Sequence, residues 1–352
     1  MKRTLPNPNG CSFRFISLAV MGVLLLAPVF ASESALDIFF IDVEGGAATL
    51  IVTPLRESIL IDCGSKLDDL RDLNRILQVA KPAGISQIDH FVVSHFHGDH
   101  FGPILQLSQT IPIRHFYDHA LMQPNQEYAK ELYPDYQKAS QGKRQVLRPG
   151  DVISLKKTTL PLRLMCVVSD GKVIPRPVGM GAGPNPYCDV PAKPEDATDN
   201  ARSIGFLLSY GDFDFLDLGD LTWNFEHQLV CPNNPLGKAD LYMVTHHGLD
   251  LSSNPALVKV IEPTVSVMCN GPHKGANPEV VSLLKSVPSL KANYQLHRNL
   301  EMSEQDNPDK SRIANWDENC QGEFIKVSVP PSTKTFSVTV GEKGKPTVFA
   351  TK

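Results

Sequence analysis

The stretch SHFHGDH, residues 94–100, carries more chemistry than any other part of this sequence. It directly follows an apolar run that has the composition of a buried strand. His95 and His97 are two residues apart, so in an extended segment their rings point to the same side and can share one metal ion. Asp99 and His100 follow a glycine that permits a sharp turn, and they can therefore address a second ion. Imidazole and carboxylate ligands at this density indicate zinc or another first-row metal, against the alternative of a histidine-rich surface loop.

Three further motifs stand at or near the ends of apolar runs. Asp62 lies in ILIDCG, Asp220 in FLDLGD, and His246 and His247 in VTHHG. Together with residues 94–100 they resemble, in type and in order, the signature of the metallo-β-lactamase superfamily. The resemblance implies the fold of that family, an α/β protein built as a four-layer αββα sandwich, and a metal-dependent hydrolase.

Within that superfamily the sequence is similar to one branch, the domain of DNA-uptake competence proteins and the phosphorylcholine esterases of cell-wall teichoic acid. Residues 40–47, FIDVEGGA, resemble the opening F-x-D-V-G-Q-G-D of the branch, with Ala47 in place of its last acid. Asn200 and Ser203 resemble its N-x-x-S, and residues 246–248 resemble its H-H-G.

The resemblance assigns roles to these residues. Two divalent ions, zinc first with manganese and iron as alternatives, would hold a hydroxide nucleophile and take up charge on the attacked group. Asp220 is expected to bridge the ions, and Asp62 to orient His ligands or water from outside them. His246 and His247 are neighbours in the chain and are not expected to face one ion together. His246 is taken as the metal ligand and His247 as the catalytic donor, although the pattern alone does not decide between them.

One ligand of the family is absent from the pattern. The superfamily usually supplies a third His to the first ion, but no His lies between His119 and His227. Asn200 or Ser203 stands at that place, so we expect a weaker first site. His273 and His297 are further candidates for this site or for the substrate, against the alternative that they are structural or exposed. Lys274 and Arg298 are candidate phosphate partners, against a default of surface solvation.

The N-terminus has the pattern of a secretory signal peptide. Three basic residues and no acid accompany an apolar run over 15–26, and APVFA at 27–31 predicts cleavage after Ala31. The run is shorter than the ~20 residues that span a bilayer, which favours a signal peptide over the alternative of an uncleaved membrane anchor. No stable membrane span is expected after processing. We expect export to the periplasm or medium, with one hydrolase domain over 35–350 and a Gly/Pro-rich insertion at about 170–199.

Strands and helices alternate along this domain, as in an α/β protein. Two apolar runs flank Glu44-Gly45-Gly46 and predict a hairpin, and two more predict a hairpin that turns at Gly211-Asp212. Apolar residues at helical spacing predict a helix over 67–79.

Composition and charge limit the function. The 352 residues are 42% hydrophobic and 20% charged, which excludes a disordered chain. Without residues 1–31 the chain has 31 basic and 38 acidic residues, a charge of −7, which disfavours nucleic acid as a partner. Cys188, Cys231 and Cys320 lie in polar stretches and are candidates for disulfides, whereas Cys63 and Cys269 are expected to be buried thiols.

The sequence therefore predicts an exported metal-dependent hydrolase that acts on a phosphoester or similar ester, either a small molecule or a cell-envelope component. A lactone or amide hydrolase of the same fold is the alternative among enzymes. A catalytically silent binding module is the alternative outside them. Substrate, native metal and oligomeric state stay open.

Overall fold

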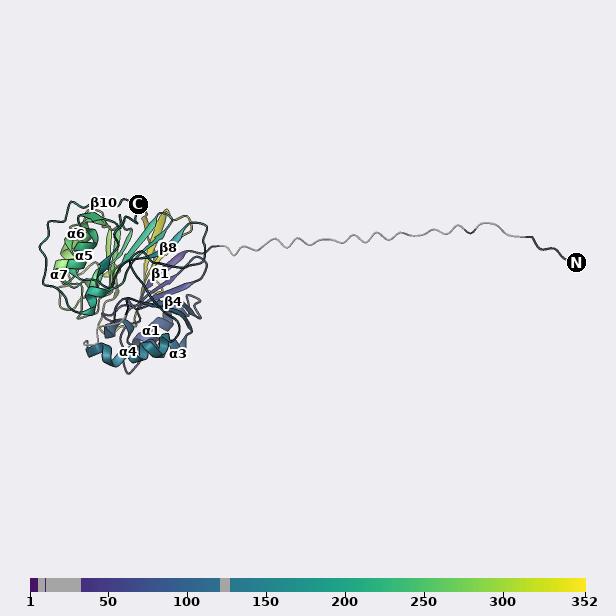
Figure 1. Cartoon of the computed structure of the whole chain (residues 1–352), viewed down its shortest axis with the longest axis horizontal. Helices are drawn as coiled ribbons and strands as arrows, with labels where there is room; N and C mark the ends of the chain where they lie inside the picture. Colours follow the sequence, from purple (N-terminus) through teal and green to yellow (C-terminus); the bar gives the residue numbers. More distant parts are fainter. Residues whose placement is uncertain (6–9, 11–32, 121–126) are drawn as a thin grey trace. The chain divides into compact units, whose positions relative to one another are not determined.

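The computed structural model describes residues 1–5, 10, 33–120 and 127–352 (Figure 1). Apart from residues 1–5 and 10, the predicted signal peptide lies outside the described residues. Glu33–Lys352 form one compact unit. Among the described helices, none is long and apolar enough to cross a membrane.

The first sheet combines strands from both ends of this unit. Its order is β20-β19-β18-β1-β2-β3-β4-β5-β6. Antiparallel pairing of β1 with β2 confirms the predicted hairpin around residues 44–46. The strands are β1 (Leu36–Phe40), β2 (Thr49–Val52), β3 (Ser58–Ile61), β4 (Ile88–Val92), β5 (Ile113–Asp118), β6 (Arg144–Val146), β18 (Ile325–Val329), β19 (Thr335–Val340) and β20 (Thr347–Ala350).

The second sheet comes from the later half of the chain. Its order is β17-β16-β15-β14-β12-β11-β8-β7, with β9 beside β8. Tyr210 pairs with Phe213 across the predicted turn at residues 211–212, which confirms that hairpin. The strands are β7 (Val152–Ile153), β8 (Leu162–Ser169), β9 (Lys172–Val173), β11 (Gly205–Tyr210), β12 (Phe213–Asp217), β14 (Leu241–Met243), β15 (Val265–Met268), β16 (Ala292–His297) and β17 (Ile313–Asn315). A separate ribbon joins β10 (Gly183–Pro184) to β13 (Asn233–Asn234).

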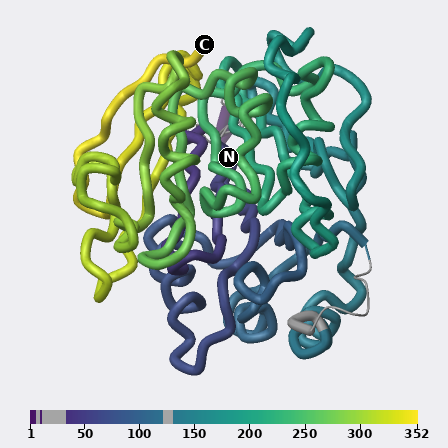
Figure 2. The backbone as a smooth tube through the Cα atoms, turned by 90° about the vertical axis from the view of Figure 1, so that its left-hand side faces the viewer, coloured from purple at the N-terminus to yellow at the C-terminus, as the bar shows by residue number. Residues whose placement is uncertain are grey.

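Helices cover the outer face of each sheet (Figures 1 and 2). The first sheet carries α1 (Arg71–Ala80), α2 (Gly98–Phe101), α3 (Ile104–Thr110) and α4 (Glu127–Ser140), and the second carries α5 (Trp223–Val230), α6 (Pro255–Val260) and α7 (Pro278–Lys285). Apolar side chains form three separate cores: Phe40 and Phe215 belong to the one shared by the sheets, Leu73 to that under α1, and Leu257 to that under α6. Three cores separated by two sheets define four layers, so the predicted αββα sandwich is confirmed.

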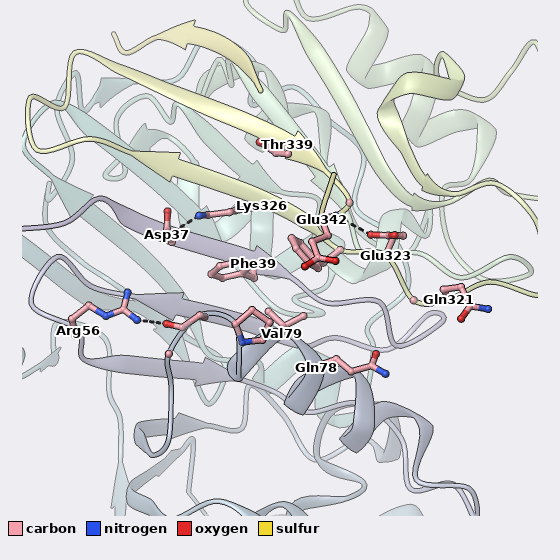
Figure 3. A pocket seen from close by; sticks show the side chains of 16 residues that line it. Asp37, Phe39, Arg56, Gln78, Val79, Gln321, Glu323, Lys326, Thr339 and Glu342 are labelled. Atoms are coloured by element: carbon pink, nitrogen blue, oxygen red, sulfur yellow. Dashed lines mark hydrogen bonds and ion pairs between the residues drawn. The ribbon is translucent and has the colours of Figure 1, made fainter. Parts of the chain in front are cut away.

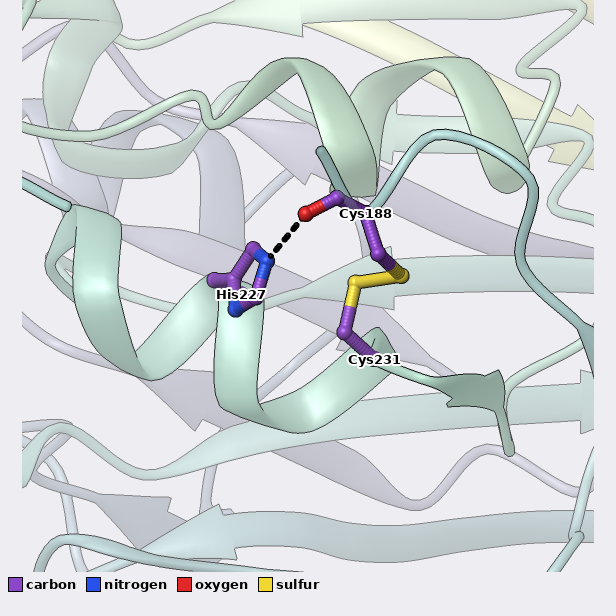
Figure 4. Close-up of side chains that lie close together, drawn as sticks. All are labelled: Cys188, His227 and Cys231. Carbon is purple, nitrogen blue, oxygen red and sulfur yellow. Dashed lines mark hydrogen bonds between the residues drawn. A yellow bond between two sulfur atoms is a disulfide. The ribbon is translucent and has the colours of Figure 1, made fainter. Parts of the chain in front are cut away.

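The predicted insertion is fastened to α5. Cys188 forms a disulfide with Cys231, the residue after that helix, and His227 Nε2 donates to the Cys188 carbonyl at 2.9 Å (Figure 4). Trp223 Nε1 donates to the carbonyl of Pro191 at 3.0 Å. The pairing predicted for two of the three cysteines is confirmed, whereas Cys320 is free. Cys63 and Cys269 are buried free thiols, as expected.

Candidate metal centre

The motifs meet because they follow neighbouring strands. Asp62 directly follows β3, the stretch 94–100 follows β4, and these two strands are parallel. Asp220 follows β12, His246 follows β14, and these are also parallel. The carboxyl ends of parallel strands lie at one edge of a sheet, so each sheet brings its motifs to a single edge.

A single carboxylate oxygen lies in the middle of the cluster. Oδ2 of Asp220 is 3.2 Å from Nε2 of His100 and of His247. It is 3.5 Å from Nε2 of His246 and 3.8 Å from that of His95. Asp220 and all four imidazoles are buried. Four histidines from two sheets therefore surround one acid.

The other ring nitrogen of each histidine shows which one carries the proton. His100 Nδ1 lies 2.7 Å from Asp62 Oδ2, and His247 Nδ1 lies 3.0 Å from the Cys269 carbonyl; both partners can only accept. Ser94 and Ser252 give their hydroxyl hydrogens to Asp62 Oδ2 and to the Leu221 carbonyl. Their oxygens therefore accept from Nδ1 of His95 and His246, each at 3.1 Å.

It follows that each of the four imidazoles, when neutral, directs its Nε2 lone pair toward the Asp220 carboxylate. Within the described part of the chain, Nε2 of His95, His100 and His247 has no hydrogen-bond partner. Lone pairs and a carboxylate repel one another unless a cation lies among them. Oriented, neutral imidazoles with Nδ1 held by an acceptor are the state in which histidine binds metals, so these residues fit a divalent cation.

The donors form two overlapping sets. One consists of His95, His100 and Asp220, and the other of Asp99, His100 and His247; in each, the ligand atoms lie within 4.8 Å of one another. Asp99 Oδ2 is 3.7 Å from His247 Nε2 and 3.8 Å from His100 Nε2. The rings of His95 and His97 lie 4.7 Å apart between centroids. The two sets have His100 in common, and together they offer nitrogen and oxygen ligands for divalent cations.

His246 and His247 both turn toward Asp220, but they do so on different sides of it. Both backbones are left-handed, with φ of 56° and 58°. This geometry, uncommon for residues other than glycine, turns two successive side chains toward Asp220. His247 joins the set of Asp99 and His100, whereas His246 Nε2 lies 3.4 Å from Asn200 Nδ2. His246 thus reaches the side where the family's third His would be expected.

Electrostatics favour positive charge at this centre. Burial opposes ionisation of Asp220, but His247, His100 and His246 outweigh it and hold the pKa of this carboxyl well below its usual range. Burial also opposes charge on His100, yet Asp220 and Asp62 raise its pKa well above the ordinary value, so a bound cation would take the place of the proton that these acids otherwise hold on His100. Burial lowers the pKa of His95, and the neighbouring imidazole of His100 lowers it further. The site keeps its acid charged and competes for any available cation.

Two predicted residues do not lie at this centre. His273 is exposed and contacts Glu301 at 2.6 Å and Glu318 at 3.0 Å. His297 Nε2 contacts Asp42 Oδ1 at 2.7 Å, in a different cluster. Both are engaged by carboxylates elsewhere, so the expectation that they serve the metal site is corrected.

Asn200 and Ser203 are buried beside the centre on and after η1 (Asp199–Arg202). Sequence reasoning missed Asp199, whose Oδ2 accepts from the Phe96 amide at 2.7 Å and from His119 Nε2 at 2.9 Å. This bond ties the His95–His97 segment to the turn that holds Asn200. No motif marks Asp199, because its partners lie far away in sequence.

The centre opens into a cleft of about 620 Å³, whose lining includes His97, Asp99, Lys66 and Lys274. A larger cavity, about 680 Å³, lies between α1 and strands β1, β18 and β19 (Figure 3). Its lining includes neither histidine nor cysteine, and its Lys326 already pairs with Asp37 at 3.0 Å. The cleft is therefore the candidate site for chemistry.

A second cluster combines similar residue types differently. Arg75 donates to Asp42 at 2.7 Å and approaches Glu44 at 2.9 Å. His297 contacts the other oxygen of Asp42, and Cys320 Sγ lies 3.5 Å from Asp42 Oδ2. We call these five residues the Asp42 cluster; its carboxylates are neutralised by cations of the protein itself.

The family described as Metallo-beta-lactamase superfamily matches residues 41–188, which include Asp62 and the stretch 94–100. The four-layer architecture is the metallo-beta-lactamase fold, and the stretch of the chain that contains Asp62 and residues 94–100 is similar to this superfamily. Asp220, His246 and His247 lie beyond the matched residues. No curated protein sequence matches the chain significantly.

Several solved structures are similar to this chain. The metallo-beta-lactamase fold protein YhfI from Bacillus subtilis is 14% identical, with 73% of this chain and 95% of that chain covered and a TM-score of 0.43. A metallo hydrolase from the archaeon Ignicoccus hospitalis is 14% identical, with coverage of 74% and 94% and a TM-score of 0.40. CmlA, a diiron β-hydroxylase from Streptomyces venezuelae, is 14% identical, with coverage of 75% and 53% and a TM-score of 0.44.

Proposed function

We propose that this protein is a metal-dependent hydrolase acting on a phosphoester or a similar ester. The observation that carries the proposal is the set of four Nε2 lone pairs around Oδ2 of Asp220. Two divalent ions held there would supply an activated water at neutral pH and neutralise charge that develops on the attacked group. Zinc suits these nitrogen and oxygen donors best, with manganese and iron as alternatives.

The chain's own residues would divide the work. His95, His97 and His246 would hold one ion, Asp99, His100 and His247 the other, and Asp220 both. Asp62 holds Nδ1 of His100 at 2.7 Å and so fixes the direction of its Nε2. Substrate would enter from the cleft, where His97 and Asp99 are exposed to it.

The phosphoester class is favoured by two features. Lys274 lines the cleft, and the sequence resembles phosphorylcholine esterases over residues 40–47 and 246–248. A lactone or amide hydrolase would use the same ligands. A silent binding module is disfavoured because the sequence retains every donor of both sets, including the acid that they share.

The test is purification followed by metal analysis and assays with bis-p-nitrophenyl phosphate, p-nitrophenyl phosphorylcholine and a lactone. We expect bound divalent metal and turnover of a phosphoester that a chelator abolishes and metal restores. Turnover of the lactone alone would select the alternative enzyme class, and metal binding without turnover of any ester would select the binding module.

We further propose export to the periplasm or medium. The basic and apolar N-terminal pattern supports it, and so does the Cys188–Cys231 disulfide, because such bonds persist in oxidising compartments. The exported protein should begin at about Ser32. N-terminal sequencing that showed Met1 on material from the periplasm or medium would contradict this proposal.

A further inference from the structure

Lys274 lies directly over the proposed metal ligands. Its Nζ contacts Oδ2 of Asp99, and its side chain is 40% exposed toward the cleft. Its stem packs on Gly45, where an added β-carbon would lie 3.1 Å from Cβ and Cδ of the lysine. The lysine is therefore held along its length, with only its outer end free to turn.

The loop that carries Lys274 is attached to the ligand turn. The Gly271 amide donates to the Lys274 carbonyl at 2.9 Å, and the Ala276 amide donates to the His247 carbonyl at 2.8 Å. A β-carbon on Gly275 would lie 2.1 Å from that same carbonyl, so the backbones approach as closely as glycine allows. The position of Lys274 is thus fixed relative to His247.

The ammonium group and a metal ion would compete for the same oxygen. Asp99 Oδ2 is the atom that faces His100 and His247, and it is also the partner of Lys274. An ion ligated by this oxygen would draw its charge away from the lysine and would repel the ammonium. The anchored stem keeps the displaced ammonium in the cleft, beside the ligands, where it needs another anion.

We infer that Lys274 binds an anionic oxygen group of the substrate, next to the bond that is cleaved. This inference rests on the proposed function, because ions must take Asp99 before the lysine is released. The other basic candidates have partners: Lys66 pairs with Asp135 at 2.8 Å, and Arg298 pairs with Glu304 at 3.0 Å while lying over the Trp316 ring. The ligand class is a phosphate or carboxylate.

Calorimetry of the zinc-loaded protein with inorganic phosphate, and separately with acetate, tests this inference. We expect Lys274→Met to weaken binding of the preferred anion at least about tenfold, and the two anions to identify that preference. Lys66→Met, in the same cleft, is the matched control and should change binding less than about twofold. Phosphate and acetate binding that are both unchanged in Lys274→Met would overturn the inference.

Two further readouts separate anion binding from a structural role. Zinc affinity should be equal or higher in Lys274→Met, because a competing cation has been removed, whereas a collapsed loop would lower it. The ratio of kcat/KM for anionic bis-p-nitrophenyl phosphate to that for neutral p-nitrophenyl acetate should fall at least about tenfold. An unchanged ratio would contradict the inference. Lysine-dependent anion binding without ester turnover would leave it standing and reject the hydrolase.

Discussion

Two buried clusters of histidine and carboxylate, at Asp220 and at Asp42, differ in where their positive charge comes from. In the Asp42 cluster, Arg75 contacts the carboxylates of Asp42 and Glu44. Burial lowers the pKa of His297, but its hydrogen bond to Asp42 outweighs burial and raises this pKa to about 9. Around Asp220, the described residues place no arginine or lysine in contact with the acid. A self-neutralised cluster stabilises the fold, whereas one with unopposed lone pairs requires a cation from outside.

The largest expected effect is that of Asp220→Asn. The amide keeps the size of the side chain but removes the charge that both ions share, so kcat should fall by about 10³-fold or more while the fold is retained. Phosphoester turnover and metal content measure the change. Asp42→Asn is the matched substitution in the other cluster and should leave metal content unchanged; loss of metal from that variant would break the comparison.

Arg75→Met should act on stability instead. Removing one partner of a buried ion pair leaves Asp42 uncompensated, which typically costs about 3–5 kcal/mol. Urea unfolding measures it, with metal content as the readout that should stay constant. Lys238→Met, at the exposed pair with Glu262, is the control and should cost about 1 kcal/mol or less. Equal losses in both variants would contradict the special role of the Asp42 cluster.

His246→Ala tests whether the two metal sites differ in affinity. With His246 at the place of the missing third His, both ions should resist chelation similarly in the natural protein. The variant should lose one equivalent first and about 10²-fold of its turnover. Stepwise chelation measures the order in which the two equivalents of metal are lost. Asn200→His should change this order little. Two unequal ions in the natural protein, made equal by Asn200→His, would restore the original expectation.

The smallest effect is a pH dependence of stability. The pKa of His297 is about 9 in the folded protein and about 6.5 in an unfolded chain, so protons favour the folded state. This contribution, on the order of 1–3 kcal/mol, is complete below about pH 6.5 and is lost as pH rises through about 9. Unfolding free energies of the natural protein and His297→Gln should therefore converge at high pH. A constant difference would refute a protonated His297.

The motifs at strand ends were predictable because the strands that precede them are parallel neighbours, which brings the motifs close together in space. Asp62, Asp220 and residues 94–100 follow apolar runs, so their meeting requires only that the strands before them pair in parallel within each sheet. The left-handed conformation of His246 and His247 could not be predicted, because nothing in VTHHG marks it. It depends on the glycines at 248 and 275, which let two loops touch.

Long-range partners explain the other misses. Asp199 and Lys274 find their partners 103 and 175 residues away, and no local pattern encodes such contacts. His297 was expected at the metal site, and its actual partner, Asp42, lies 255 residues away in the sequence. Helix α4 was not predicted; it contains Pro134, which ordinarily argues against a helix interior.

A crystal structure of the metal-loaded protein, with anomalous scattering recorded at the absorption edge of the bound metal, compares the two clusters directly. We predict two anomalous peaks that share Asp220, one among His95, His97 and His246 and one among Asp99, His100 and His247. No peak should appear at Asp42, where Arg75 and His297 already supply the charge. A peak at Asp42, or none at Asp220 in fully loaded protein, would contradict this assignment.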